Sequence, residues 1–280
     1  MAIREIQIYL FAFSFLIVSI IITIGLYYLG KAFPGQDYYN PLGLIVGFGP
    51  LITAVIFILV NRNDKFRDVA LKKFNVQLLM KIVVILVFVY VIEYLLFSFF
   101  GLVEFRLRLK QLLLYNTEFG NISYLFIAFL IPFVYTGIGE EYGWRGYLFH
   151  KLIGLKWVEH VLILNLVWAL WHVPIILYGI MGGFSNFSMD FILFTIQAIE
   201  LGIILVYVRL KSGSVIPVMI LHGFINFFHG IVLPMFYAYI KSSDWSQLIL
   251  IFLLLPFAIY YYTKGRKLYN ERLNTVANMV

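Results

Sequence analysis

Several strongly polar side chains interrupt apolar segments of this sequence, and their types could activate water. They stand in three short patterns, EEYGWR at 140–145, WALWH at 168–172 and HGFIN at 222–226. The polar members are Glu140, Glu141, Arg145, His172, His222 and Asn226. Ionisable groups are costly inside a bilayer, so they mark a functional site there by default. A carboxylate and a histidine can together take a proton from water, so the patterns predict hydrolysis within a membrane.

The spacing of these residues assigns them to helix faces. His222 and Asn226 are four residues apart and therefore lie on one face of a helix. Glu141 and Arg145 have the same spacing, which suits an ion pair. Consecutive helical residues diverge by about 100°, so Glu140 and Glu141 cannot point the same way. We therefore expect Glu140 to serve the chemistry while Glu141 pairs with Arg145.

The composition indicates that membrane-spanning helices must position these residues. Hydrophobic residues make up 62% of the chain and charged residues 12%, against roughly 45–50% and about 25% in soluble domains. A spanning helix needs about 20 mostly apolar residues. The apolar runs are 8–29, 42–60, 79–100, 123–152, 158–178, 189–209, 214–232 and 246–263. We expect an all-α integral membrane protein with about eight transmembrane helices, forming one domain over residues 1–280.

The run at 123–152 is unusual because a polar stretch divides it. We interpret it as one long helix whose polar middle faces protein. The alternative is a span that ends near Gly139 and continues as an interfacial helix. The segment 101–121 alternates leucines with basic residues and is expected to lie at the membrane interface.

The distribution of basic residues predicts the orientation. Eight spans put both termini on one side, where 15 Lys and Arg residues fall, against five on the other side. The positive-inside rule therefore predicts cytoplasmic termini. At 1.5 Å per helical residue, Glu140, His172, His222 and Asn226 then lie roughly 12–21 Å deep. Their shared depth indicates one site.

The remaining chemistry is limited by composition. The chain has no cysteine, which excludes disulfides and thiolate catalysis. The net charge of +7 could suggest nucleic acid. The basic residues instead punctuate apolar runs, which is typical of membrane topology, so we expect no nucleic-acid partner.

The three patterns, in this order, resemble the motifs of the CPBP intramembrane proteases, the family of the type II CAAX prenyl endopeptidase. The resemblance covers about 123–232. The family's second motif often begins with Phe and here begins with Trp168, a departure that we expect to affect packing more than chemistry. Glu141 and Arg145 carry over as the supporting part of the first motif.

The resemblance also implies catalytic roles. Glu140 and His172 would position and activate the attacking water, and His222 and Asn226 would stabilise the tetrahedral oxyanion. The residues also permit a zinc site with Glu140, His172 and His222 as ligands and water as the fourth. No H-E-x-x-H pair is present, and an Asn beside the second His suits an oxyanion donor. We favour a metal-free site without a cofactor.

The resulting hypothesis is a multi-pass intramembrane endopeptidase of the cell membrane. Its partners would be the bilayer and a membrane-anchored substrate, either a prenylated CAAX-type C-terminus or a bacteriocin-type peptide. One alternative is a transporter or proton relay, because intramembrane Glu and His serve pumps as well. Another is a non-catalytic bacteriocin self-immunity protein.

Several further polar and aromatic residues receive no catalytic role. Glu93, Glu200 and His229 lie within apolar runs, and the sequence does not assign their functions. We expect His160 to be solvated near the cytoplasmic surface and Trp157 to anchor the interface.

Overall fold

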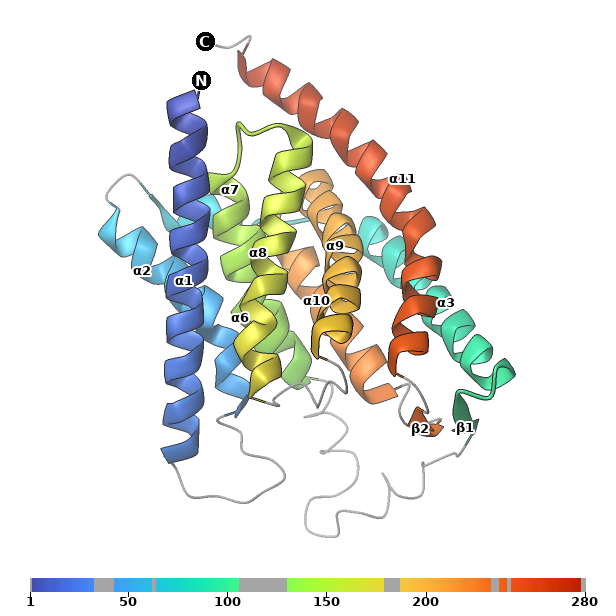
Figure 1. Ribbon diagram of the computed structural model, residues 1–280. Helices are drawn as coiled ribbons and strands as arrows, with labels where there is room; N and C mark the ends of the chain where they lie inside the picture. The colour runs from blue at the N-terminus through green and yellow to red at the C-terminus, as the bar shows by residue number, and fades with distance from the viewer. Residues whose placement is uncertain are drawn as a thin grey trace.

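The computed structural model describes residues 2–32, 43–61, 64–105, 130–178, 187–232, 237–240 and 243–277. Almost all of them are helical, which confirms the predicted all-α membrane fold (Figure 1). Within these ranges the strands β1 (Val103–Phe105) and β2 (Tyr237–Ile240) form one short antiparallel pair. Most of the segment 101–121, which was predicted to be interfacial, lies outside the described residues.

Five helices of the described chain are long and apolar enough to cross a membrane. They are α1 (Ala2–Ala32), α3 (Val76–Phe99), α8 (Trp157–Leu177), α9 (Phe187–Ser212) and α11 (Ser243–Ala277). Two predicted runs form shorter helices, namely α2 (Gly49–Val60) and α10 (Ile216–Phe227). The 3₁₀ turn η1 (Gly43–Phe48) precedes α2, and the π-helical turn η5 (Phe228–Val232) follows α10. The protein is therefore a multi-pass membrane protein.

The divided run forms one continuous helix over 130–151. It comprises η3 (Phe133–Ile138), α6 (Gly139–Glu141), η4 (Tyr142–Leu148) and α7 (Phe149–Lys151), of which η3 and η4 are π-helical. Its polar middle is buried in protein, as expected. The helix therefore does not end near Gly139, and the point at which it leaves the membrane stays a prediction. Short π-helical segments occur frequently at functional sites, and here two of them flank the adjacent glutamates.

Glycines allow the polar middle of this helix to pack against neighbouring backbone. A Cβ added at Gly139 would lie 2.7 Å from the carbonyl oxygen of Gly47 in η1. One added at Gly143 would lie 2.5 Å from the carbonyl oxygen of Pro50 in α2. Small residues four apart let helices approach closely in membranes. These contacts fix the position of the turn that carries Glu140 and Glu141, which lie between the two glycines in the sequence.

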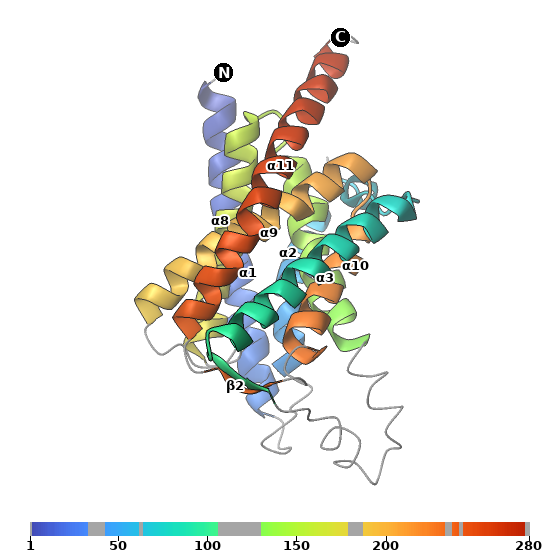
Figure 2. The ribbon, with the colours of Figure 1, turned by 90° about the vertical axis from the view of Figure 1, so that its right-hand side faces the viewer.

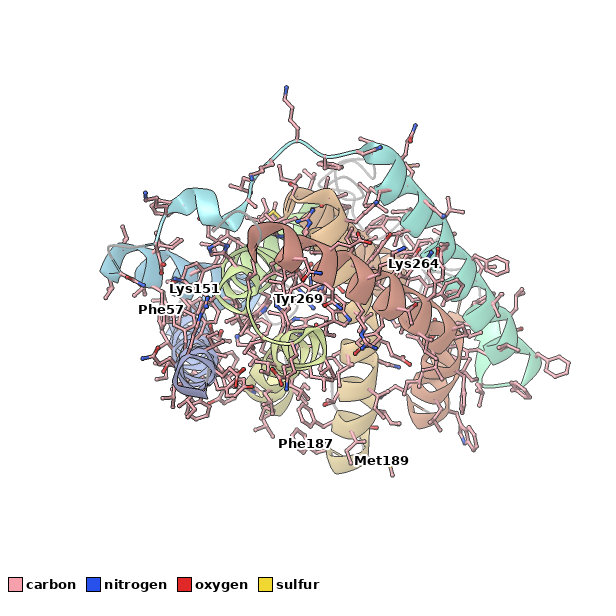
Figure 3. All side chains as sticks on the ribbon, turned by 90° about the horizontal axis from the view of Figure 1, so that it is seen from above. Phe57, Lys151, Phe187, Met189, Lys264 and Tyr269 are labelled. Atoms are coloured by element: carbon pink, nitrogen blue, oxygen red, sulfur yellow. The ribbon has the colours of Figure 1, made fainter. Side chains whose placement is uncertain are left out.

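The start of α1 and the end of α11 lie at the same end of the helix bundle (Figures 1 and 2), which agrees with the even number of spans expected from the sequence. Other segments with many basic residues reach the same end. Lys151 forms an ion pair with Asp64 in the 61–75 segment, and the amide of Gly154 donates to the hydroxyl of Tyr269 near the end of α11 at 3.2 Å. Figure 3 looks onto this end, where Lys151 and Tyr269 are labelled. Which membrane face it meets remains a prediction.

The burial of two aromatic residues corrects the sequence analysis. His160 is fully buried and its Nδ1 lies 3.2 Å from the carbonyl oxygen of Leu152. Trp157 is also buried. Both rings pack against Tyr269, at 5.3 Å between centroids. The predictions of a solvated His160 and an interfacial Trp157 are wrong, because α11 extends beyond α8 and covers this end of it.

Candidate active site

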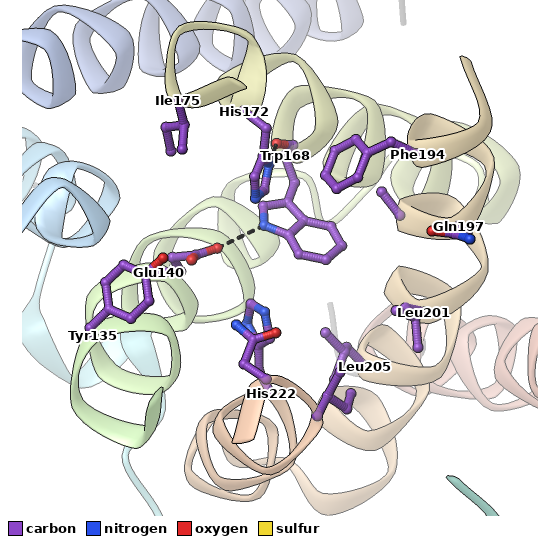
Figure 4. A pocket seen from close by; sticks show the side chains of 13 residues that line it. Tyr135, Glu140, Trp168, His172, Ile175, Phe194, Gln197, Leu201, Leu205 and His222 are labelled. Atoms are coloured by element: carbon purple, nitrogen blue, oxygen red, sulfur yellow. Dashed lines mark hydrogen bonds between the residues drawn. The ribbon is translucent and has the colours of Figure 1, made fainter. Parts of the chain in front are cut away.

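Polar residues from each of the three sequence patterns line one pocket. Its walls come from the 130–151 helix, α8, α9 and α10 (Figure 4). The lining residues are Tyr135, Glu140, Trp168, His172, Ile175, Phe194, Gln197, Ala198, Leu201, Leu205, His222, Ile225 and Asn226. The predicted residues Glu140, His172, His222 and Asn226 are therefore neighbours in space, although they come from three helices.

The carboxylate of Glu140 has one fixed oxygen and one oxygen left for chemistry. The indole Nε1 of Trp168 donates a hydrogen bond to Oε2 at 2.9 Å (Figure 4). Glu140 is only 3% exposed, yet it lines the pocket. This arrangement leaves Oε1 as the oxygen that can meet a water or substrate group.

The main chain of α8 sets the proton position of His172. Its Nδ1 lies 2.8 Å from the carbonyl oxygen of Trp168. A carbonyl oxygen can only accept, so Nδ1 carries the hydrogen and donates it. The other ring nitrogen, Nε2, then carries a lone pair in the neutral ring. His172 can therefore accept a hydrogen bond or a proton from a group in the pocket.

Glu141 holds a buried polar network beside the pocket. Its Oε1 accepts hydrogen bonds from Arg145 Nη1 at 2.9 Å and from His222 Nδ1 at 2.7 Å. The predicted Glu141–Arg145 ion pair is thus present, and both side chains are fully buried. The second Arg145 nitrogen, Nη2, donates to Asn165 Oδ1 at 3.0 Å. A buried charge is tolerated when it is paired and hydrogen-bonded, so this network explains how α6 and η4 carry charges inside the protein.

The contact between Glu141 and His222 orients the histidine ring. Because Nδ1 is engaged with the carboxylate, Nε2 is the nitrogen available to the pocket. Asn226 follows one turn later on α10 and lines the same pocket. The two side chains therefore share a helix face, as the four-residue spacing predicts.

The three unassigned residues lie away from this pocket lining. His229 Nε2 is 3.8 Å from Glu93 Oε1, which links η5 to α3. Glu200 on α9 is 4% exposed, and neither of its carboxylate oxygens has a hydrogen-bond partner among the described residues.

The side chains do not present a ready metal site. Within the described ranges, no group of three His, Cys, Asp or Glu side chains converges as metal ligands would. Hydrogen bonds engage Oε2 of Glu140 and Nδ1 of each histidine, which leaves Oε1 and both Nε2 atoms available to the pocket. The choice between metal-free and zinc-dependent hydrolysis stays a prediction.

Sequence reasoning missed two residues of the site. Trp168 was expected to affect packing, but its indole N–H bonds directly to Glu140. Asn165 was not singled out, although it accepts from Arg145. Trp168 and Asn165 precede His172 by four and seven residues, so all three lie on one face of α8. This spacing could have identified both residues from the sequence.

Comparison with known proteins agrees with this geometry. Residues 122–228 match the family model described as Type II CAAX prenyl endopeptidase Rce1-like. The chain is also similar to CAAX prenyl protease 2 of Methanococcus maripaludis, with 23% identity over 218 residues. That alignment covers 74% of this chain and 80% of the relative. The matched region contains all three polar patterns, so the resemblance inferred from them is confirmed.

Proposed function

Because the site lies in an Rce1-like CAAX prenyl endopeptidase domain, we propose that this protein is an intramembrane endopeptidase of the glutamate type. The main support for the proposal is that Glu140, His172, His222 and Asn226, which come from three helices, line one pocket. The family match supports proteolysis within a membrane, and the assignment of roles to these four residues is our own.

Glu140 and His172 act on the attacking water. The free Oε1 of Glu140 accepts a proton from the water while the water oxygen bonds to the carbonyl carbon of the scissile peptide. Nε2 of His172 accepts a hydrogen bond from the second O–H of the water and holds the oxygen in line; this hydrogen stays on the oxygen that becomes part of the product acid. Glu140 then passes its proton to the amide nitrogen, the C–N bond breaks, and an acid and an amine result. This is general acid–base catalysis by one carboxyl group.

His222 and Asn226 act on the other end of the scissile carbonyl. His222 carries a hydrogen on both ring nitrogens in this step, so that Nδ1 donates to Glu141 and Nε2 donates to the carbonyl oxygen. Asn226 donates to the same oxygen through its amide, and this oxygen becomes negative in the tetrahedral intermediate. Donors fixed before the reaction stabilise this charge without reorganisation. Glu141 fixes the His222 ring through Nδ1, and Arg145 fixes Glu141. The supporting pair therefore acts through His222 and does not touch the substrate.

The surroundings of the pocket favour a substrate that is tethered to the membrane. Ile175, Phe194 and Leu201 contribute apolar walls next to the polar groups. A lipid anchor would deliver the end of a peptide to this depth. A prenylated CAAX-type C-terminus is the substrate class that the name of the Methanococcus maripaludis relative suggests, and a bacteriocin-type apolar peptide is the second class.

Cleavage of a farnesylated CAAX peptide by the purified protein in lipid nanodiscs tests the proposal. We expect turnover by the wild type and none by Glu140→Gln. Glu200→Gln is the matched control, because it makes the same change at a buried carboxylate outside the pocket lining, and we expect it to keep wild-type turnover.

Turnover near the wild-type rate in a folded Glu140→Gln protein would refute the assignment of the base. The same peptide without its farnesyl group and an apolar bacteriocin-type peptide form two further arms. They determine which of the two substrate classes the pocket accepts.

A further inference from the structure

Trp168 contacts four of the charged and catalytic side chains of the site, namely Glu140, Arg145, His172 and His222. Its Nε1 donates to Glu140, its ring lies under Arg145, and it makes T-shaped contacts with the rings of His172 and His222. We infer that Trp168 is a positioning residue, whose indole N–H holds the Glu140 carboxylate so that Oε1 faces the water. This inference rests on the proposed function and adds a residue to its machinery.

The hydrogen bond is well suited to fix a carboxylate. An indole Nε1–H can donate and cannot accept, so Glu140 Oε2 must be the acceptor. The distance of 2.9 Å is that of a well-formed bond. Both residues are almost fully buried, so little water competes for the contact. Without this donor, the carboxylate could rotate and exchange its two oxygens at the pocket.

The indole is itself fixed in its plane by neighbouring charges and rings. The Arg145 guanidinium lies 4.4 Å above its ring, which is a cation–π contact. Arg145 cannot move freely because Glu141 and Asn165 each bind one of its terminal nitrogens. The direction of the N–H bond is therefore determined by a network that extends from the 130–151 helix to α8.

Trp168 orients both groups that we assign to water activation. Its side chain binds Glu140, and its main-chain carbonyl accepts from Nδ1 of His172. A change of the side chain keeps the carbonyl, and with it the hydrogen bond to His172. Replacing the indole therefore tests the Glu140 contact separately from the orientation of His172.

The chain contains a close internal control on the same helix. Trp171 is as buried as Trp168, and its Nε1 donates to Thr23 Oγ1 at 2.8 Å. Trp171 is not among the residues that line the pocket. The same replacement of N–H by sulfur at Trp171 removes an indole donor without touching Glu140, and it keeps the ring that packs against His172.

Nuclear magnetic resonance of the indole N–H groups tests the contact without reference to activity. The chain has five tryptophans, so ¹⁵N-indole labelling gives five signals, and Trp168→Phe and Trp171→Phe assign two of them. We expect Glu140→Ala to move the Trp168 signal upfield, since a hydrogen bond is lost, and to leave the Trp171 signal in place. A Trp168 signal that does not move would overturn the inference.

Kinetics test the consequence of the contact. Site-specific replacement of Trp168 by 3-benzothienylalanine keeps the fused ring and replaces the N–H donor by sulfur. We expect kcat on the farnesylated peptide to fall about 10- to 100-fold, as for loss of a hydrogen bond to a charged group, with KM unchanged because the pocket wall keeps its shape. The same replacement at Trp171 should keep kcat. Equal kcat in the two variants would refute the positioning role.

The two readouts separate this inference from the proposed function. A wild-type protein that cleaves none of the peptides would overturn the proposed function and the kinetic role together. A shift of the Trp168 indole signal in Glu140→Ala would then still establish the hydrogen bond between the two side chains.

Discussion

Gly143→Ala should destabilise the protein by obstructing the contact between the 130–151 helix and α2. An added Cβ would lie 2.5 Å from the carbonyl oxygen of Pro50, and 2.6 Å from both its carbonyl carbon and its Cβ. These atoms belong to backbone and a proline ring, so no flexible side chain can rotate away. The helices would have to separate by several tenths of an ångström.

The cost follows from the packing that would be lost. Inserting a methyl group into a well-packed core typically costs about 1–3 kcal/mol. In a domain of 150–250 residues each kcal/mol corresponds to roughly 2–4 °C in Tm. We expect Gly143→Ala to lower the unfolding temperature by roughly 2–12 °C by the same scaling, with a loss of turnover because Glu140 and Glu141 lie in the separated region.

Thermal unfolding in detergent, followed by tryptophan fluorescence, measures this effect. Gly25→Ala is the matched control, since it makes the same change in helix α1 where nothing lies within 4 Å of the added Cβ. Alanine has the higher helix propensity by about 1 kcal/mol, so this variant should unfold at or above the wild-type temperature. If Gly143→Ala and Gly25→Ala unfolded at the same temperature, the reasoning about close backbone approach would be refuted.

Two further predictions concern orientation and mechanism. A cysteine introduced at the exposed Lys65 should resist an impermeant external thiol reagent in intact cells, while one at Lys241 should react. The reason is that the count of basic residues assigns the two positions to opposite membrane faces. The reverse labelling pattern would show that the predicted topology is inverted. Asn226→Ala should lower turnover roughly 10²–10³-fold, as for an oxyanion donor, and chelation should leave wild-type activity intact. Stoichiometric zinc that is lost in both His172→Ala and His222→Ala would instead establish the metal-dependent alternative.

Composition and spacing were sufficient to predict the all-helical membrane fold and the candidate site. His222 and Asn226 line the same pocket because their four-residue spacing keeps them on one helix face. The Glu141–Arg145 pair also followed from its four-residue spacing. These features are local, so the sequence contains them directly.

The contacts between distant segments could not be predicted in the same way. His222 and Glu141 are 81 residues apart, and their contact depends on how α10 packs against α6. Nor does an apolar helix in a membrane indicate which of its faces meets protein, because lipid is as apolar as a protein core. For this reason the bond from Trp168 to Glu140 was missed, and the burial of His160 and Trp157 beneath α11 was not foreseen.

The two adjacent glutamates show how one helical turn can carry a structural and a reactive carboxylate. Glu141 is fully enclosed, and its Oε1 is already bound by Arg145 and His222. Glu140 accepts one hydrogen bond from a neutral donor, and it lines the pocket. The divergence of about 100° between consecutive residues separates the two environments. Exchanging the two environments would require the turn to rotate, which the close contacts at Gly139 and Gly143 oppose, so these glycines help to determine which carboxylate faces the pocket.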